Sequence, residues 1–201
     1  MKYAFEKDRQ PIESGTWPGA RWDLYTTLGI EDDEALPDDE DCSAVFCMGV
    51  NSTGDTVLMK TMRELEYGRE EEVWGLPGGH IDETTEGFET INMTRDREAL
   101  EEGGFLPESP VPIAVRVIRR QPGTHQSTRG RIYPEVACIP YFIGRTPDTL
   151  LEPTGEEVLE SGFFGRDEAM ALINESDAVI LDIGFAALES GHVVFDRPAD
   201  N

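Results

Sequence analysis

The chain is poor in lysine and in basic residues generally. Of its 201 residues, 41 are aspartate or glutamate and only 17 are lysine or arginine, which gives a formal net charge of −24. Three of the basic residues are lysines: Lys2, Lys7 and Lys60. This excess of negative charge disfavours non-specific binding to nucleic acid or to an anionic membrane, because both carry charge of the same sign.

The acidity has two interpretations. The plainer one is an ordinary soluble acidic protein. The other is a protein from a high-salt cytoplasm, a halophile's, where dissolved ions screen the repulsion between surface carboxylates. The composition alone is compatible with both.

Cysteines and long apolar runs are also scarce. The three cysteines, Cys42, Cys47 and Cys138, form no C-x-x-C pair, which argues against a disulfide framework and a zinc ribbon. We therefore expect reduced thiols in a cytoplasmic protein.

The longest apolar stretch, Ala178–Leu188, contains Asp182 and is too short for a membrane span. The first ten residues lack the apolar core of a signal peptide.

The chain is expected to divide into an N-terminal segment and one domain. Residues 1–41 end in the acidic run EDDEALPDDED (31–41), so we expect an N-terminal extension with an acidic linker, followed by a domain over 42–201. Trp17 and Trp22 are expected to anchor the extension, either onto the domain or onto a second copy of the chain in a homodimer.

Within 42–201, patterns of strand type alternate with patterns of helix type. Strands are expected over 43–50, 56–62, 72–80, 112–120 and 131–144, and the stretch 161–173 should hold a short strand and a helix start. Helices are expected over 88–103 and about 176–190, the second with Ser176 as N-cap and Gly191 as C-cap. Strands with interspersed helices predict an α/β sandwich with a mixed β-sheet.

The stretch REALEEGGF (97–105) concentrates three glutamates on one helix face. At about 100° per residue, Glu98, Glu101 and Glu102 span an arc of roughly 100°. The acids alone would occur by chance in so acidic a chain, but Arg97, the following glycines and the upstream LPGG make the pattern specific. Convergent carboxylates suit a hard cation such as Mg²⁺, which often shares its coordination with substrate phosphates. The stretch therefore predicts a magnesium site and attack on phosphorus.

These residues carry a resemblance to a known family. The stretch GG…ETINMTRDREALEEGGF resembles the signature of the Nudix hydrolases, G-x5-E-x7-R-E-U-x-E-E-x-G-U, where U is apolar. The positions that match in register are Arg97, Glu98, Ala99, Glu101, Glu102, Gly104 and Phe105, with Glu89 as the first glutamate. VWGLPGGHID and EEVLESGFFGRDEAMAL (156–172) resemble the flanking elements. One departure is a loop four residues longer, because nine residues rather than five separate Gly79 from Glu89.

The resemblance implies a Nudix-type α/β/α sandwich and a magnesium-dependent hydrolase, with Mn²⁺ as an alternative ion. The implied substrate is a nucleoside diphosphate linked to another moiety, cleaved at its diphosphate by a metal-activated water. The implied metal ligands are Glu98, Glu101, Glu102 and the Gly78 carbonyl, and Arg97 is similar to the arginine that orients the helix carboxylates. The alternative is a Nudix-like module that senses a nucleotide or sugar nucleotide without cleaving it.

The proton acceptor of the implied reaction has three candidates: Glu89, Glu156 and Glu157. If the helix extended back to Glu89, that side chain would point about 180° away from Glu98. Glu156 and Glu157 precede a strand in a loop, where a side chain can swing over the metals. We therefore expect one of the loop pair to be the base and Glu89 to be structural.

Arginines gather around the loop QPGTHQSTRG (121–130), although the chain is poor in bases. They are Arg116, Arg119, Arg120, Arg129 and Arg131. The planar guanidinium group suits phosphate, so these side chains are candidates for substrate binding. The alternative is that each pairs with one of the many surface acids.

Overall fold

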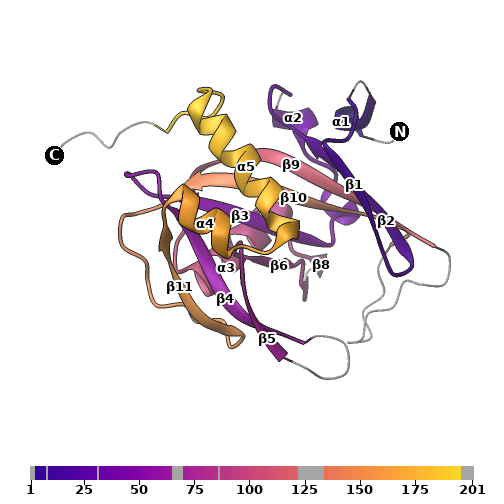
Figure 1. Ribbon diagram of the computed structural model, residues 1–201. Helices are drawn as coiled ribbons and strands as arrows, with labels where there is room; N and C mark the ends of the chain where they lie inside the picture. The colour runs from indigo at the N-terminus through magenta and orange to yellow at the C-terminus, as the bar shows by residue number, and fades with distance from the viewer. Residues whose placement is uncertain are drawn as a thin grey trace.

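The computed structural model describes residues 3–7, 9–30, 32–64, 70–85, 87–121 and 134–195. Its main feature is a nine-stranded sheet with helices on both faces (Figure 1). The strands that follow one another across this sheet are β1 (Glu13–Trp17), β2 (Ala20–Thr26), β9 (Glu108–Arg120), β10 (Val136–Arg145), β3 (Ala44–Val50), β4 (Thr56–Glu64) and β11 (Val158–Phe164). In addition, β5 (Glu70–Gly75) pairs with β4, and β6 (Gly78–His80) pairs with β3.

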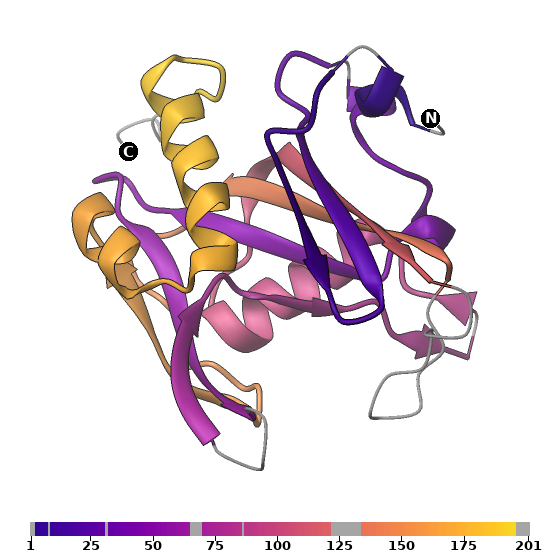
Figure 2. The same cartoon turned by 45° about the vertical axis from the view of Figure 1, so that its right-hand side comes forward.

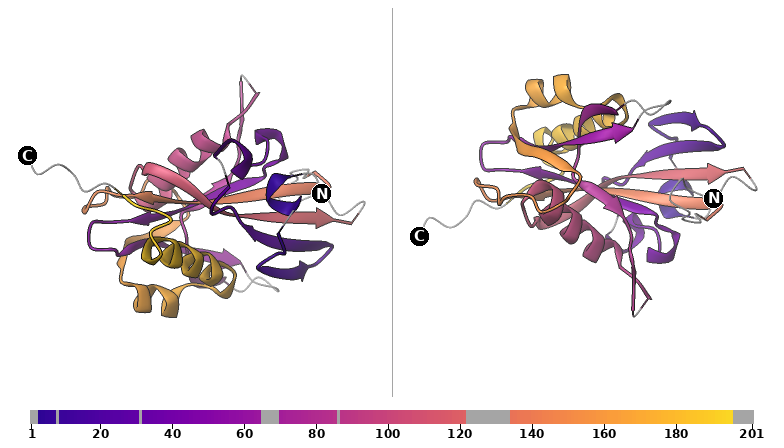
Figure 3. Two further views of the ribbon diagram at one scale, coloured as in Figure 1. Left: turned by 90° about the horizontal axis from the view of Figure 1, so that it is seen from above. Right: turned by 90° about the horizontal axis from the view of Figure 1, so that it is seen from below.

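The sheet is mixed, as the sequence predicted. β10 runs parallel to β3, and the other pairs of the sheet are antiparallel. Helix α3 (Ile91–Gly103) lies on one face, and α4 (Arg166–Leu172) and α5 (Glu175–Glu189) lie on the other (Figure 3). This arrangement confirms the predicted α/β sandwich.

Each face of the sheet has its own apolar core. Alternation along β3 explains the division, because successive side chains of a strand point to opposite faces. Val45 and Cys47 pack toward α3, in a cluster that includes Ala99 and Phe105. Met48 packs toward α5, in the other cluster. The two helices are thereby fixed on opposite sides of one scaffold.

The N-terminal segment differs from the expected separate extension, because it completes the sheet. β2 pairs along β9 from Ala20 opposite Arg120 to Thr26 opposite Ala114. Figure 2 shows the β1–β2 hairpin beside the rest of the sheet. Trp22 packs against the core on the α5 face, so the anchor is formed on the domain itself. Leu24 and Tyr25 are buried on opposite faces.

The acidic run is also partly structured. It contains α2 (Asp32–Ala35) and a 3₁₀ turn, η1 (Asp39–Asp41), while α1 (Ala4–Lys7) lies near α2 (Figure 1). Ala35 is buried. Asp39 Oδ1 accepts a hydrogen bond of 2.8 Å from the backbone N–H of Ile91, the first residue of α3. The run therefore packs against the start of α3 instead of acting only as a solvated linker.

Helix boundaries depart from the predicted ones at specific caps. α3 begins at Ile91 rather than at 88, because β7 (Glu83–Thr84) and β8 (Gly87–Phe88) form a small hairpin in the long loop. Thr90 caps the helix by accepting from Met93 N at 3.2 Å. For α5, Ser176 as N-cap is wrong. Asn174 occupies that position, and its side chain accepts from Asp177 N at 3.2 Å.

The C-terminal ends of α3 and α5 each have a glycine at or just beyond the cap. α3 ends at Gly103, and its C-cap is Gly104, whose φ of 72° is in the left-handed region that glycine adopts without strain. The C-cap of α5 is Ser190, with Gly191 just beyond it, so the prediction of Gly191 as C-cap was wrong by one residue. Among the described residues, no helix is long and apolar enough to cross a membrane.

The acidic surface leads to the first testable prediction. With a net charge of −24, carboxylate repulsion opposes the compact state, and salt screens it. We expect the melting temperature to rise steadily as KCl increases from about 0.05 M to about 2 M. Thermal denaturation followed by circular dichroism measures this. A flat or falling melting temperature would exclude adaptation to high salt.

Candidate functional site

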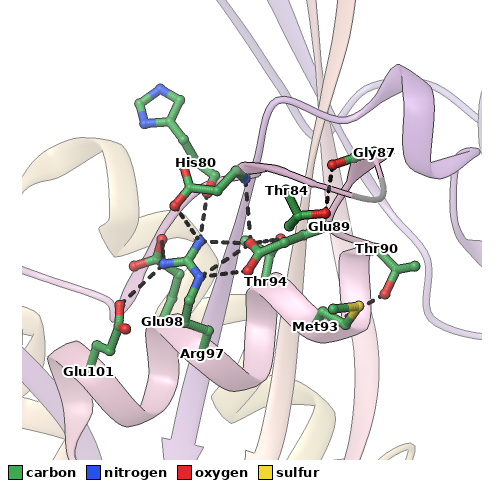
Figure 4. A network of polar contacts seen from close by, with 11 residues as sticks. His80, Thr84, Gly87, Glu89, Thr90, Met93, Thr94, Arg97, Glu98 and Glu101 are labelled. Atoms are coloured by element: carbon green, nitrogen blue, oxygen red, sulfur yellow. Dashed lines mark hydrogen bonds and ion pairs between the residues drawn. The ribbon is translucent and has the colours of Figure 1, made fainter.

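A network of charged side chains centres on Arg97, in the middle of α3 (Figure 4). Its Nε donates to Glu89 Oε1 at 2.9 Å, and its Nη2 donates to Glu89 Oε2 at 2.8 Å. Its Nη1 donates to Glu98 Oε1 at 2.8 Å and to Glu101 Oε2 at 3.2 Å. Nη2 also donates to the His80 carbonyl at 3.0 Å, which ties α3 to β6. One guanidinium group therefore bonds two carboxylates of α3 and the carboxylate of Glu89, which precedes the helix.

Glu89 lies just before the helix cap, so the placement predicted from a continuous helix does not apply. The chain leaves the helix at Thr90, and the Glu89 carboxylate turns toward Arg97. Its Oε2 also accepts from Thr94 Oγ1 at 3.0 Å and from Asp82 N at 3.4 Å. The hydrogen bond from Arg97 is the main reason that the pKa of Glu89 falls below its usual value. The Glu89 side chain is thus buried, and both of its carboxylate oxygens accept hydrogen bonds within the network.

The LPGG stretch, residues 76–79, is called the glycine turn here, and it packs against the helix carboxylates. The N–H of Gly78 donates to Glu102 Oε2 at 2.8 Å. At the next residue, a Cβ on Gly79 would collide with the carboxylate of Glu98, so a side chain at this position would displace that carboxylate. The two glycines of the predicted motif therefore touch two of the three predicted metal ligands.

The helix carboxylates also interact through their charges. Burial raises the pKa of Glu98 above its usual value, against the opposing effect of Arg97. Burial raises the pKa of Glu102 to about 7, and the charges of Glu98, Glu157 and Glu101 add to the rise. A cation among these groups would stabilise their charged forms.

The donor chemistry of this cluster fits a hard divalent ion, which prefers carboxylate oxygens. Within the described ranges, no three carboxylate, imidazole or thiol groups form a ready-made ligand set. The contacts explain this, since Arg97 holds Glu98 and Glu101 while the Gly78 N–H holds Glu102. The roles of these glutamates and of the Gly78 carbonyl as metal ligands stay predictions.

The loop that carries Glu156 and Glu157 is fastened to the end of α3. Leu151 N donates to the Gly104 carbonyl at 2.8 Å. The N–H groups of residues 154 and 155 donate to the Glu101 carbonyl at 2.9 and 2.8 Å. Glu156 and Glu157 follow in an exposed turn, and the charge of Glu157 reaches Glu102. The structure therefore brings this loop to the carboxylate cluster.

Two described members of the arginine group, Arg116 and Arg119, do not share one surface. Arg116 is buried on the α5 face, stacked near the rings of Trp22 and Tyr141, and donates to the Ser176 carbonyl at 2.8 Å. Arg119 pairs with Glu6 and with Asp23, the latter at 2.9 Å.

Arg116 and Arg119 therefore both bond to other residues of the protein. For Arg119 the structure matches the alternative of pairing with acids, and neither Arg116 nor Arg119 is supported as a phosphate ligand. Arg120 donates to the Pro134 carbonyl at 3.1 Å. Arg129 and Arg131 lie outside the described residues.

Two members of the site escaped the sequence reasoning. Thr94 donates to Glu89 from inside the helix, and the His80 carbonyl accepts from Arg97. No local signal marks a backbone carbonyl as a partner. Thr94 could have been found from its spacing, because residues three apart on a helix are neighbours and Arg97 follows it by three.

Comparisons with known proteins define the fold. No family model matches the chain, and no curated protein matches it in sequence. Among solved structures, the pyrophosphohydrolase BsRppH of Bacillus subtilis matches with 13% identity and a TM-score of 0.57, over 90% of this chain and 98% of that one. The Nudix domain of NrtR from Shewanella oneidensis, solved with ADP-ribose, matches with 16% identity and a TM-score of 0.53, over 80% and 96%. The chain has the Nudix fold.

Proposed function

We propose that the protein is a magnesium-dependent Nudix pyrophosphohydrolase that cleaves the diphosphate linkage of a nucleoside diphosphate linked to another moiety. The observation that carries the proposal is the cluster of Glu98, Glu101 and Glu102 on α3, with Arg97 as its organiser and the glycine turn against it. The two compared structures agree with this class of substrate, since one is a pyrophosphohydrolase and the other holds ADP-ribose.

In this proposal, Glu98, Glu101 and Glu102 hold Mg²⁺, or Mn²⁺ in its place. The bound ion supplies an activated water and offsets charge on the phosphates. Arg97 keeps the helix carboxylates in place through its bonds to Glu98 and Glu101 while Glu89 anchors the guanidinium group.

The proton from the attacking water passes to a carboxylate of the loop, Glu156 or Glu157. Support for this assignment comes from the loop's anchoring on α3 and from the charge of Glu157, which reaches Glu102. Glu89 is a poor candidate because both of its oxygens accept hydrogen bonds, including those from Arg97.

A sensing module is the alternative function, since a Nudix domain can bind a nucleotide without cleaving it. The enzyme is favoured because the chain has all three glutamates of the motif, Glu98, Glu101 and Glu102. We also propose a cytoplasmic location, in agreement with Cys42, Cys47 and Cys138, which are buried and form no disulfide. A homodimer stays a prediction.

A substrate panel tests the proposed function. Purified protein is incubated with ADP-ribose, NADH, diadenosine polyphosphates or capped nucleotides, each with Mg²⁺, and the products are separated by chromatography. We expect cleavage of at least one compound between its phosphorus atoms, and loss of cleavage with a chelator. Tight calorimetric binding of a panel member that is never cleaved would favour the sensing module instead.

A further inference from the structure

The N-terminus of α5 is bonded to the strand that leads into the glycine turn. Asn174, the N-cap of α5, donates from Nδ2 to the Trp74 carbonyl at 3.2 Å, and its backbone N–H reaches the same oxygen at 3.3 Å. Trp74 and Ile173 also form an isolated parallel bridge. The cap of this helix is thus shared with β5.

Asp177 extends this contact by one step. Its carboxylate accepts from Asn174 Nδ2 at 3.0 Å, and it lies close enough to the backbone N–H of Leu76 for that group to counteract the rise of its pKa. A Cβ on Gly75 would lie 3.4 Å from Asp177 Oδ2, which places the carboxylate against the backbone between Trp74 and Leu76. Asp177 therefore faces the strand.

A capping role alone does not account for this placement. An acid at the third helical position ordinarily bonds the N–H of the cap residue and can do so facing solvent. Here the Asn174 N–H bonds Trp74, and the Asp177 carboxylate turns inward. Burial of this carboxylate raises its pKa, so its charge is kept there at a free-energy cost. Because the Asp177 carboxylate points inward, it lies next to the backbone of Leu76, which a solvent-facing cap would not reach.

β5 continues into residues 76–79, which pack against the candidate metal ligands Glu98 and Glu102. The carbonyl of Pro77 accepts from Cys47 N at 2.9 Å, and the next N–H, of Gly78, bonds Glu102. Residues 76–79 are therefore held at one end by an acid of α5 and at the other by an acid of α3. The two helices lie on opposite faces of the sheet (Figure 3). This short segment lies between them, next to Asp177 of α5 and bonded to Glu102 of α3.

We propose that Asp177, with Asn174, is a positioning residue that sets the glycine turn against Glu98 and Glu102. The inference rests on the proposed function only for the statement that these two carboxylates bind metal. Supporting contacts behind a ligand hold it in the geometry that an ion requires, so their loss weakens metal binding although they touch no metal.

The direct test is amide hydrogen exchange in the metal-free protein. In Asp177→Ala we expect the amides within residues 76–80, which are those of Leu76, Gly78, Gly79 and His80, to exchange at least about tenfold faster than in the wild type, because their local opening becomes easier. Asp177→Asn should lie close to the wild type, since its amide oxygen can still face the Leu76 N–H. The matched control is Glu175→Ala, which removes an exposed acid from the same helical turn. It should leave residues 76–80 unchanged.

A second variant protects the test against misfolding. If Asp177→Ala does not fold, Asn174→Ser keeps a good N-cap but loses the amide that bonds Trp74 and Asp177. It should also speed exchange at 76–80. Faster exchange confined to the first turn of α5, with 76–80 unchanged in the folded variant, would overturn the proposal.

Titration with Mn²⁺ alone, followed by electron paramagnetic resonance, links this segment to the site. Asp177→Ala should bind Mn²⁺ about tenfold more weakly than the Glu175→Ala control. Equal affinity, with unchanged exchange at 76–80, would refute the positioning role. If the wild type neither binds Mn²⁺ nor cleaves the panel but exchange at 76–80 still responds, the proposed function fails while the positioning of the turn stands.

Discussion

Glutamine at position 101 or 102 is expected to lower turnover by more than about tenfold while the protein stays folded. The reason is that each carboxylate supplies charge to a cation, and glutamine has the same shape without the charge. The Glu101 side chain is 44% exposed, so its packing matters little. At position 102, the glutamine oxygen can still accept from the Gly78 N–H, so the glycine turn keeps its partner.

The measurement is the Mg²⁺-dependent rate on whichever compound of the panel is cleaved, together with a melting curve for each variant. Asp96→Asn is the matched control, because it removes one negative charge from the same helix at a residue bonded to Arg95. Near-normal rates in both Glu101→Gln and Glu102→Gln would remove this cluster as the metal site.

Loss of the proton acceptor is the second large effect. We expect Glu157→Ala or Glu156→Ala to remove the acidic limb of the pH–rate profile at saturating Mg²⁺. A general base works only when deprotonated, so the wild-type rate falls as pH drops through its pKa, and a variant without that base gives a low rate with a flatter profile. Of the two, Glu157 is favoured because its charge helps to raise the pKa of Glu102.

Glu89→Gln supplies the contrast. It weakens the bond to Arg97 and should lower the rate through poorer orientation of the helix carboxylates, but the acidic limb should persist. The assignment is wrong if Glu89→Gln alone abolishes that limb while both loop variants retain it. Melting curves for all three variants separate loss of the base from loss of the fold.

The site was predictable where the signal is local. The arc of Glu98, Glu101 and Glu102 follows from helical geometry, and the glycines before it mark a tight approach of backbone to helix. The start of α3 was not predictable from the same pattern. Phe88 continues the apolar periodicity, but it pairs with Glu83 in a hairpin made by the longer loop.

The arginines near residue 120 show that closeness in sequence does not place side chains on one surface. Arg116 and Arg119 are close in sequence, yet they are three residues apart on one strand, and an odd spacing places side chains on opposite faces. The structure agrees, since Arg116 contacts α5 and Arg119 contacts Glu6 of α1. Strand periodicity could have separated them once β9 was recognised. Pairing of β2 with β9 had no such local cue.

The pairing of β2 with β9 also has a consequence for how the chain folds. Ala20 lies opposite Arg120, so the hairpin made first during synthesis finds its place only after about a hundred further residues. Without that hairpin, β9 would end the sheet with a row of unpaired N–H and C=O groups, which is a template for association with other chains. The β1–β2 hairpin thus covers the edge of β9, and a fragment that begins at the acidic run would expose an aggregation-prone strand.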